Sequence, residues 1–293
     1  MELTIDSVTK RFKEKVAVKE VSLEITPGVW GLLGANGAGK TTLMRMAAGI
    51  MKPDGGQIRC EGIPINVLKE KYREIFGYLP QEFGFYPEFT AIDYLEYMAG
   101  LKGLTRRAAK VKIEELLERF SLTQAAKMKI SKMSGGTKRR VGIAQALLND
   151  PKILIMDEPT GGLDPGERVR FRNLLSEASR DRIVLISTHI VSDVEYIASR
   201  IAVMKQGSLI ALGSTPELVQ MARGKVYTCL VPQDKLAEYE RKLNIVNLRN
   251  EQEGKVSLRY LSQSPLTEDS QADEPRLEDL YLYLFPNETK EAE

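Results

Sequence analysis

Residues 34–42 read GANGAGKTT, a glycine-rich stretch that ends in a lysine and two threonines. The stretch fits the pattern GxxxxGK[ST], which is typical of loops that hold the phosphates of a nucleoside triphosphate. Because glycine makes up about 7% of an average protein, a chance match in a chain of this length has a probability of roughly 1%. The stretch therefore predicts a phosphate-binding loop between a strand and a helix.

The residue types in this loop suit that chemistry. Glycines let backbone N–H groups turn towards the phosphates, and the following helix presents its positive amino end to them. Lys40 is expected to contact the β- and γ-phosphates, and the Thr41 hydroxyl to bind Mg²⁺. An ordinary strand-to-helix turn would not require the Lys40–Thr41 pair. The expected nucleotide contacts are Asn36, Gly37, Ala38, Gly39, Lys40, Thr41 and Thr42.

The composition is that of an ordinary globular protein, with 43% hydrophobic and 28% charged residues in 293. A net charge of +2 gives no electrostatic reason to expect a nucleic-acid partner. Cys60 and Cys229 stand far apart without neighbouring histidines, which argues against a disulfide framework or a zinc site. The stretch MELTIDSVTKRF lacks an apolar signal core, and no apolar run approaches the ~20 residues that span a bilayer. We therefore expect a cytoplasmic chain without a membrane span.

The hydrophobic pattern predicts an α/β fold. Period-two alternation over the first 30 residues indicates antiparallel strands. The apolar segments KILIMDEP and RIVLIST alternate with helices at 167–178 and from Ser192, as in a parallel sheet covered on both faces. Helical spacing without strands between Thr90 and Leu122 indicates a helical insert.

The expected architecture is a P-loop NTPase with a mostly parallel sheet core, an N-terminal antiparallel β subdomain, a helical insert and a small α+β C-terminal extension. We assign residues 1–220 to the main domain, with a helical subdomain at about 85–150, and 221–293 to the extension. In the extension, KVYTCLVP and KVSLRYLS predict strands around a helical LAEYERKL. A flexible acidic linker is expected at about 262–275, before the short helix RLEDLYLYLF.

Asp157 and Glu158 follow four apolar residues in ILIMDEP and precede Pro159. Ligands of open α/β sheets bind at the carboxyl ends of the strands, where these two acids fall. A Mg²⁺-bound triphosphate needs a carboxylate for the metal and a base that orients the attacking water. Alone, the pair would more often be solvated loop residues. Together with the phosphate loop, Asp157 predicts a metal ligand and Glu158 a catalytic base.

The stretch MSGGTKRRVGIAQALL predicts a second anion site. Ser134 suits the N-cap of a helix, and Gly135 and Gly136 leave the backbone of its first turn accessible. Such a helix start binds anions, yet the loop at 34–42 already accounts for the phosphates of one nucleotide. The second site hints that the nucleotide of another subunit is completed here.

With these motifs, the sequence resembles the ATP-binding subunits of ABC transporters over about residues 1–220. The matches to the family are, in order, Phe12 under the adenine, Gln81 in the glutamine loop, Ser134-Gly135-Gly136 in the LSGGQ signature, Asp164 in the D-loop and His189 as the switch histidine. Singly, such residues are usually core or surface, and a lone histidine is usually structural. Their occurrence together, in this order in one chain, is a specific sign of the family.

The resemblance implies ATP and Mg²⁺ as ligands and Glu158 and His189 as catalytic residues. It implies Thr41, Gln81 and Asp157 as metal ligands. The chain departs from the family pattern at Ala35, at Met133 and Thr137 in the signature, and at Phe12, where tyrosine is more frequent. The basic cluster 127–140 is interpreted as a solvated helical face rather than a nucleic-acid site.

The resemblance predicts an ATPase subunit that pairs head to tail with a second ATPase subunit, the same chain or a close paralogue. It would drive a transmembrane permease from the inner face of the cell membrane, and its tail resembles drug, bacteriocin and sodium exporters. The alternatives are a soluble ABC-type ATPase in translation or DNA repair, and a P-loop kinase or GTPase. Aromatic residues at 83–87, after Gln81, predict the surface that contacts the permease.

Overall fold

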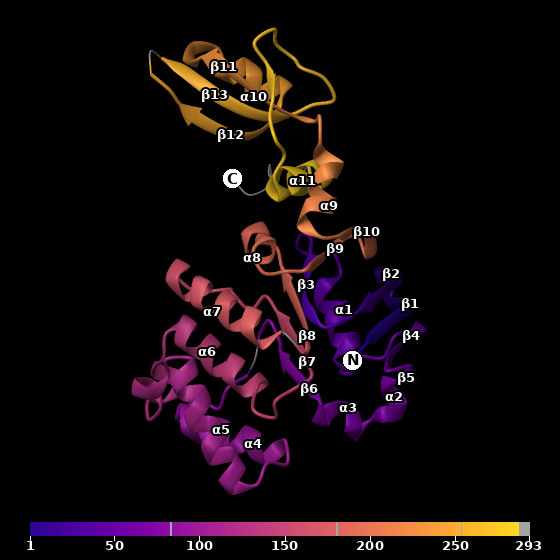
Figure 1. Cartoon of the computed structure of the whole chain (residues 1–293), viewed down its shortest axis with the longest axis vertical. Coiled ribbons are helices and arrows are strands. Elements are labelled where there is room, and N and C mark those ends of the chain that lie inside the picture. Colours follow the sequence, from indigo (N-terminus) through magenta and orange to yellow (C-terminus); the bar gives the residue numbers. More distant parts are fainter. Residues whose placement is uncertain (83, 180, 253, 287–293) are drawn as a thin grey trace. The chain divides into compact units, whose positions relative to one another are not determined.

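The computed structural model describes residues 1–82, 84–179, 181–252 and 254–286 (Figure 1). Residue contacts divide the chain into two compact units, Met1–Ile210 and Ala211–Glu293. This division falls within strand β10, ten residues before the boundary expected from the sequence, and the expected domain limits stay predictions. Each unit is described by itself.

The first unit is built on a six-stranded sheet with the order β10-β9-β3-β8-β7-β6. Strands β9, β3, β8, β7 and β6 pair in parallel. Their bounds are β3 Gly28–Leu33, β6 Phe76–Leu79, β7 Ile153–Asp157, β8 Ile183–Thr188, β9 Arg200–Lys205 and β10 Ser208–Gly213. The predicted parallel core is confirmed.

The sequence of the central strands explains their position. Every residue of β7, ILIMD, and of β8, IVLIST, is buried. Continuous apolar runs of this length are typical of parallel strands that are covered on both faces. The polar residues at their carboxyl ends are therefore buried with them.

A four-stranded sheet with the order β2-β1-β4-β5 stands beside this core, and β1 pairs antiparallel with both β2 and β4. Its strands are β1 Leu3–Phe12, β2 Lys15–Ile25, β4 Gly55–Cys60 and β5 Ile63–Pro64. One hydrophobic core joins Leu23 of this sheet, Leu43 of helix α1 (Lys40–Ala47) and Ile155 of β7. The expected N-terminal antiparallel subdomain is thus packed onto the parallel sheet through α1.

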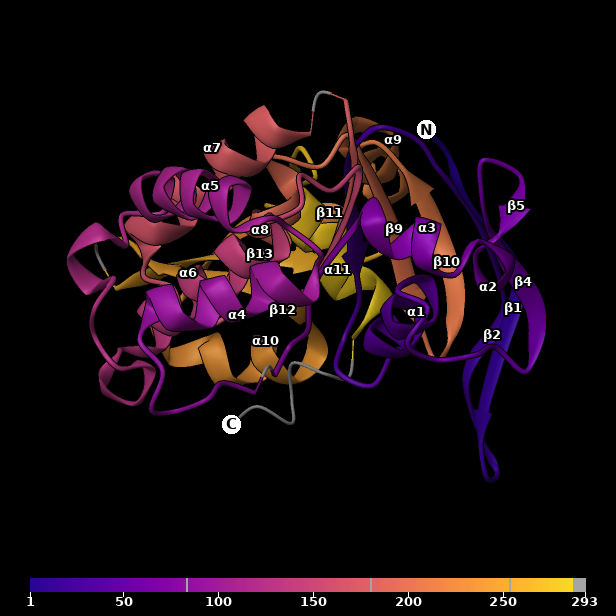
Figure 2. The same ribbon diagram turned by 90° about the horizontal axis from the view of Figure 1, so that it is seen from below.

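Helices α4, α5 and α6 gather on one side of the first unit, away from β1, β2 and β4 (Figure 2). Thr90 caps α4, Thr105 caps α5 and Ser134 caps α6, each by accepting a hydrogen bond from a backbone N–H of the first turn. Their bounds are α4 Ala91–Leu101, α5 Arg106–Arg119 and α6 Gly135–Ala146, with 3₁₀ turns at Thr123–Ala125 and Ile130–Lys132 between the last two. They form the helical insert, whose exact limits stay a prediction.

The remaining helices of the first unit are α1 Lys40–Ala47, α2 Ile65–Leu68, α3 Glu70–Glu74, α7 Pro165–Ala178 and α8 Val191–Glu195. Helix α7 begins at a proline, where the missing N–H costs no hydrogen bond, and Asp164 caps it in a capping box with Glu167.

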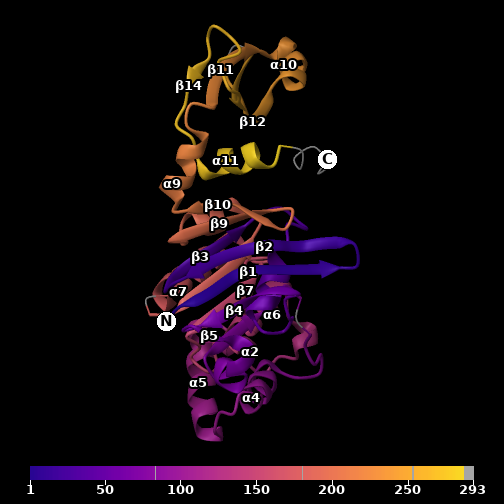
Figure 3. The ribbon, with the colours of Figure 1, turned by 90° about the vertical axis from the view of Figure 1, so that its right-hand side faces the viewer.

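The second unit holds a four-stranded sheet with the order β12-β13-β11-β14, and α10 lies against one face of it (Figure 3). Leu236 and Tyr239 of α10 pack on a buried cluster that includes Leu258 and Tyr260. The elements are α9 Thr215–Val219, a 3₁₀ turn Gln220–Ala222, β11 Val226–Pro232, a 3₁₀ turn Gln233–Lys235, α10 Leu236–Lys242, β12 Asn244–Asn250, β13 Lys255–Leu261, β14 Gln271–Ala272 and α11 Leu277–Leu284.

Two features of this unit differ from the sequence interpretation. Strand β12 was not expected, because its residues are polar or exposed at most positions and lack clear alternation. Two residues of the expected linker form β14, which pairs with Tyr227 and Thr228 of β11. No helix within the described residues is long and apolar enough to cross a bilayer.

Gly77 in β6 tests the close packing of the parallel sheet on α6. A Cβ at residue 77 would lie 2.3 Å from the carbonyl oxygen of Ala146, so the backbone must shift to accept it. Gly77→Ala is expected to lower the free energy of unfolding by about 1–3 kcal/mol. Urea denaturation would measure the change.

Gly100 in α4 offers a matched control, because a Cβ there meets no described atom within 4 Å. Gly100→Ala is expected to raise the free energy of unfolding by about 0.5–1 kcal/mol, since alanine favours the helix. Equal effects of the two substitutions would contradict the packing.

Candidate active site

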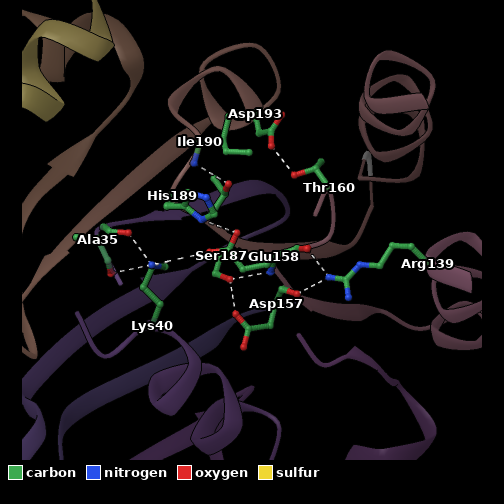
Figure 4. A network of polar contacts seen from close by, with 12 residues as sticks. Ala35, Lys40, Arg139, Asp157, Glu158, Thr160, Ser187, His189, Ile190 and Asp193 are labelled. Atoms are coloured by element: carbon green, nitrogen blue, oxygen red, sulfur yellow. Dashed lines mark hydrogen bonds and ion pairs between the residues drawn. The ribbon is translucent and has the colours of Figure 1, made fainter. Parts of the chain in front are cut away.

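The predicted site residues converge because four neighbouring parallel strands end at one edge of the sheet. The phosphate loop follows β3, His189 follows β8, Asp157 ends β7 with Glu158 next to it, and Gln81 follows β6 by two residues. In the ladders, Leu33 pairs with Thr188, and Ser187 pairs with Asp157. The structure thus brings these motifs to one edge of the sheet, and Figure 4 shows Lys40, Asp157, Glu158 and His189 close together there.

The phosphate loop is tightly folded, and its glycines are required by sterics. Gly39 has a φ of 104°, in the left-handed region, and a Cβ there would lie 2.4 Å from the Ala17 carbonyl oxygen. A Cβ on Gly34 would lie 2.3 Å from the carbonyl oxygen of Met204. Helix α1 begins directly after Gly39, so its amino end faces the loop.

Lys40 lies buried within this loop. Its Nζ donates hydrogen bonds to the carbonyl oxygens of Gly34 at 2.5 Å and Ala35 at 3.0 Å. Thr41 and Thr42 follow in the first turn of α1 and are half-buried, whereas Asn36 and Gly37 are exposed. The ammonium group is therefore held at the centre of the loop, where an anion would meet it.

The Glu158 carboxylate stands between two other predicted site residues. Its Oε1 lies 3.9 Å from Lys40 Nζ, and its Oε2 lies 3.0 Å from His189 Nδ1. The side chain of Glu158 is only 11% exposed, whereas that of His189 is 51% exposed. This arrangement places a carboxylate and an imidazole beside the cation of the phosphate loop.

The backbone of Glu158 is strained. Its φ of 51° lies in the left-handed region, which non-glycine residues rarely adopt. Its N–H donates to both the carbonyl oxygen of Ser187 at 3.2 Å and the hydroxyl of Ser187 at 3.0 Å. The turn therefore points the Glu158 side chain towards the loop while β8 holds its amide.

Asp157 is fully buried at the end of β7. Its Oδ1 accepts a hydrogen bond from the Ser187 hydroxyl, while its Oδ2 is buried and has no hydrogen-bond partner among the described residues. An unsatisfied buried carboxylate oxygen is costly, and a bound cation would satisfy it. The oxygens of Asp157, Thr41 and Gln81 are a donor set that suits Mg²⁺.

The Ser134 helix start lies away from the phosphate loop of the same chain. Helix α6 packs on β6, and β8 and β7 stand between β6 and β3. Ser134 caps α6 by accepting from Thr137 N–H at 3.1 Å, and it is exposed together with Gly135. Ser134, Gly135 and Gly136 are therefore separate from the phosphate loop within one subunit, and the anion site expected at them stays a prediction.

The same helix start adjoins Asp164. A Cβ on Gly136 would lie 2.7 Å from Glu167 Oε2, the atom that also accepts from the Asp164 N–H at 3.4 Å. Glu167 is held in turn by Arg140, whose Nε lies 3.3 Å from Oε1. Glu167 therefore lies next to both Asp164, at the D-loop position, and Gly136, at the signature position.

Phe12 ends β1 with its ring 45% exposed, and Lys10 Nζ lies 5.8 Å from the ring centroid. An exposed ring at the end of a strand is available for stacking on a flat ligand.

Sequence reasoning missed three groups around Glu158. Ser187 binds both Asp157 and Glu158, and a polar residue within the apolar run IVLIST was a signal for it. Thr160 donates to the buried carboxylate of Asp193, which ties the turn after Glu158 to α8. Local sequence pattern carries no sign of that contact.

Arg139 is the third missed group, and for it the prediction of a solvated basic face is wrong. Its side chain is buried and donates to carbonyl oxygens at the carboxyl ends of β6 and β7. Its neighbours Lys138 and Arg140 are also basic, so the local sequence gave no signal that distinguished it.

Comparison with known proteins gives a consistent result. The family model described as "ABC transporter" matches residues 18–161. An uncharacterized ABC transporter ATP-binding protein of Bacillus subtilis (strain 168), YxlF, is 39% identical over 79% of this chain and 77% of its own. The Nod factor export ATP-binding protein I of Burkholderia pseudomallei (strain 1710b) is 38% identical over 76% of this chain and 74% of its own.

A solved structure agrees with these relatives. The dimeric ATP-binding cassette MJ0796, in a post-hydrolysis state bound to ADP and Pi, superposes with a TM-score of 0.64 and 26% sequence identity. The match covers 72% of this chain and 98% of the cassette.

Proposed function

The chain belongs to the family of ABC transporter ATP-binding proteins, and we propose that its hydrolysis of ATP drives export through a separate membrane permease. It is the ATP-binding subunit of such a transporter and an ATPase. The observation that carries the proposed chemistry is the Glu158 carboxylate, set between Lys40 of the phosphate loop and His189. The relative named for Nod factor export supports the export direction, and no relative named above points to translation or DNA repair.

The proposed steps follow from the geometry. Lys40 and the backbone N–H groups of the loop bind the phosphates of ATP. Glu158 orients the attacking water and accepts its proton, and its low exposure keeps the carboxylate in one place. His189 contacts Glu158 Oε2, and its proposed role is to fix the carboxylate beside the phosphate loop.

The oxygens of Thr41, Gln81 and Asp157, including the unsatisfied Asp157 Oδ2, suit Mg²⁺ and are its proposed ligands. When bound, the ion offsets the negative charge that develops on the phosphates. Ser187 holds the other Asp157 oxygen and so orients the carboxylate for this task.

We further propose that ATP joins two subunits head to tail. ABC ATP-binding subunits dimerise, and MJ0796 is dimeric in its post-hydrolysis state. Within one subunit the exposed Ser134 lies apart from the phosphate loop, so a second subunit must supply it to the γ-phosphate. The partner is a second copy or a close paralogue.

Glu158→Gln tests the base. It is expected to lower kcat by about 10²–10⁴, because an amide cannot accept the proton from water. Nucleotide binding should persist, since Lys40, Thr41 and Asp157 are unchanged. Phosphate release and equilibrium binding of a labelled ATP would separate the two effects, and an unchanged kcat would exclude Glu158 from the mechanism.

Ser134→Arg tests the shared site. The bulky charged side chain is expected to abolish ATP-dependent dimerisation while leaving ATP affinity of the monomer within about twofold, because Ser134 is exposed and remote from the loop of its own chain. Light scattering of the Glu158→Gln protein should show a dimer with Mg·ATP and a monomer with ADP. A dimer that survives Ser134→Arg would argue for another interface.

Permease contact is proposed at the aromatic residues that follow Gln81. Phe83 lies outside the described residues. Tyr86 is 50% exposed and Tyr97 is 41% exposed, with ring centroids 5.3 Å apart. Exposed aromatic pairs next to a loop are typical of interaction surfaces. A peripheral position at the inner face of the membrane, held by the permease, follows from this proposal.

Tyr86→Glu is expected to release the protein from membranes that contain its permease, because a buried charge at the contact is unfavourable. Tyr196→Glu is the matched control, since Tyr196 is 74% exposed on the surface after α8. Membrane flotation would measure binding of both variants, with ATP affinity as the check on folding. Equal retention of the two variants on membranes would place the contact elsewhere.

A further inference from the structure

Arg139 of α6 links the two strand ends that carry Glu158 and Gln81. Its Nη2 donates to the carbonyl oxygen of Asp157 at 2.6 Å and to that of Glu158, and its Nε donates to that of Pro159 at 3.1 Å. Its Nη1 donates to the carbonyl oxygens of Gln81 at 2.9 Å and Pro80 at 3.3 Å. Figure 4 shows the guanidinium beside Asp157 and Glu158.

The guanidinium stays charged in this position. Burial lowers the pKa of Arg139 to about 10, while the nearby charges of Asp157 and Glu158 favour its ionised form. The group is therefore a cation at neutral pH, and its N–H donors are arranged in a planar fork. A buried cation is tolerated when hydrogen bonds compensate it, as the carbonyl oxygens of two separate segments do here.

Arg139 binds the carbonyl oxygen of Glu158, the residue whose backbone is left-handed. A φ of 51° turns the Glu158 carbonyl out of the direction that β7 would give it. The Arg139 guanidinium donates hydrogen bonds to this carbonyl oxygen and to those of Asp157 and Pro159 on either side. The hydrogen bonds hold the turn in a conformation that is unfavourable for a residue with a side chain. Because the side chain direction of Glu158 follows from its backbone, the fork also fixes where the carboxylate points.

We propose that Arg139 is a positioning residue for hydrolysis: it holds the Glu158 turn in its left-handed form and fixes that turn to the Gln81 backbone. This inference rests on the proposed role of Glu158 as the base. It assigns Arg139 no contact with ATP. The proposed effect passes through Glu158, whereas an effect through Asp157 or Gln81, whose carbonyl oxygens Arg139 also binds, would change the affinity for Mg·ATP.

Arg139→Lys and Arg139→Met test the proposal in the full-length chain. Lysine keeps the charge but lacks the fork that reaches both segments, and methionine removes the charge. Both are expected to lower kcat by about tenfold or more, since a shift of about 1 Å in a catalytic group costs on the order of 10²-fold. KM for Mg·ATP and the affinity for labelled ATP should change by less than about twofold, because the phosphate loop is untouched.

A double-mutant cycle separates positioning from a general structural role. In the Glu158→Gln background, Arg139→Lys is expected to lower the residual kcat by less than about twofold, because the base it positions is already lost. Full additivity of the two losses in kcat would overturn the proposal, as would a loss of ATP affinity equal to the loss in kcat. If Glu158→Gln itself left kcat unchanged, the proposed function would fail instead, so the two failures are distinguishable.

Arg259 provides the control for removal of a buried guanidinium. It is buried in the second unit, where it binds Asp279 and Asp273. Arg139→Lys and Arg259→Lys are both expected to lower the melting temperature, but Arg259→Lys is expected to leave kcat unchanged. If Arg259→Lys lowered kcat as much as Arg139→Lys at a matched loss of stability, the effect of Arg139 would be one of stability and the proposal would be wrong.

Discussion

Parallel pairing of β3, β8, β7 and β6 requires the four strands to run in the same direction and to end at one edge of the sheet. Segments that lie far apart in the chain are thereby brought together by the pairing of the strands that precede them. The phosphate loop, the Asp157–Glu158 pair, His189 and Gln81 all follow from this constraint. Because β7 and β8 are buried at every residue, packing of the core fixes the positions of their carboxyl ends. The site residues that follow these strands are fixed with them.

Two buried cationic side chains, Lys40 and Arg139, lie at this edge of the sheet. Lys40 is held by the carbonyl oxygens of its own loop, and Arg139 by carbonyl oxygens of two strand ends. Ser187 occupies the middle, with its hydroxyl shared between Asp157 and the Glu158 amide. Backbone atoms thus supply most of the ligands for the buried cations, so the conformation of the chain and the placement of charge depend on each other.

Backbone strain and an unsatisfied polar atom occur at two adjacent residues, Glu158 and Asp157. Glu158 has a left-handed backbone, and Asp157 has a buried oxygen without a partner in the described part of the chain. Each costs stability unless a ligand or a neighbour compensates it. Their adjacency at the end of a fully buried strand suits the proposed site for a metal-bound nucleotide, in which Arg139 would compensate the strain and the ligand the unsatisfied oxygen.

The sequence by itself determined the fold class and the set of motifs, because the glycine spacing, the apolar strand runs and the SGG helix start are local signals with a direct physical cause. It could not place Arg139, Thr160 or Asp193, since their partners are backbone or side-chain atoms on other elements that no local pattern reveals. It also missed β12, whose pairing depends on β13 and not on its own weak alternation. Only the tertiary structure decided that a residue in a basic run is buried, because burial depends on which face of α6 meets the sheet.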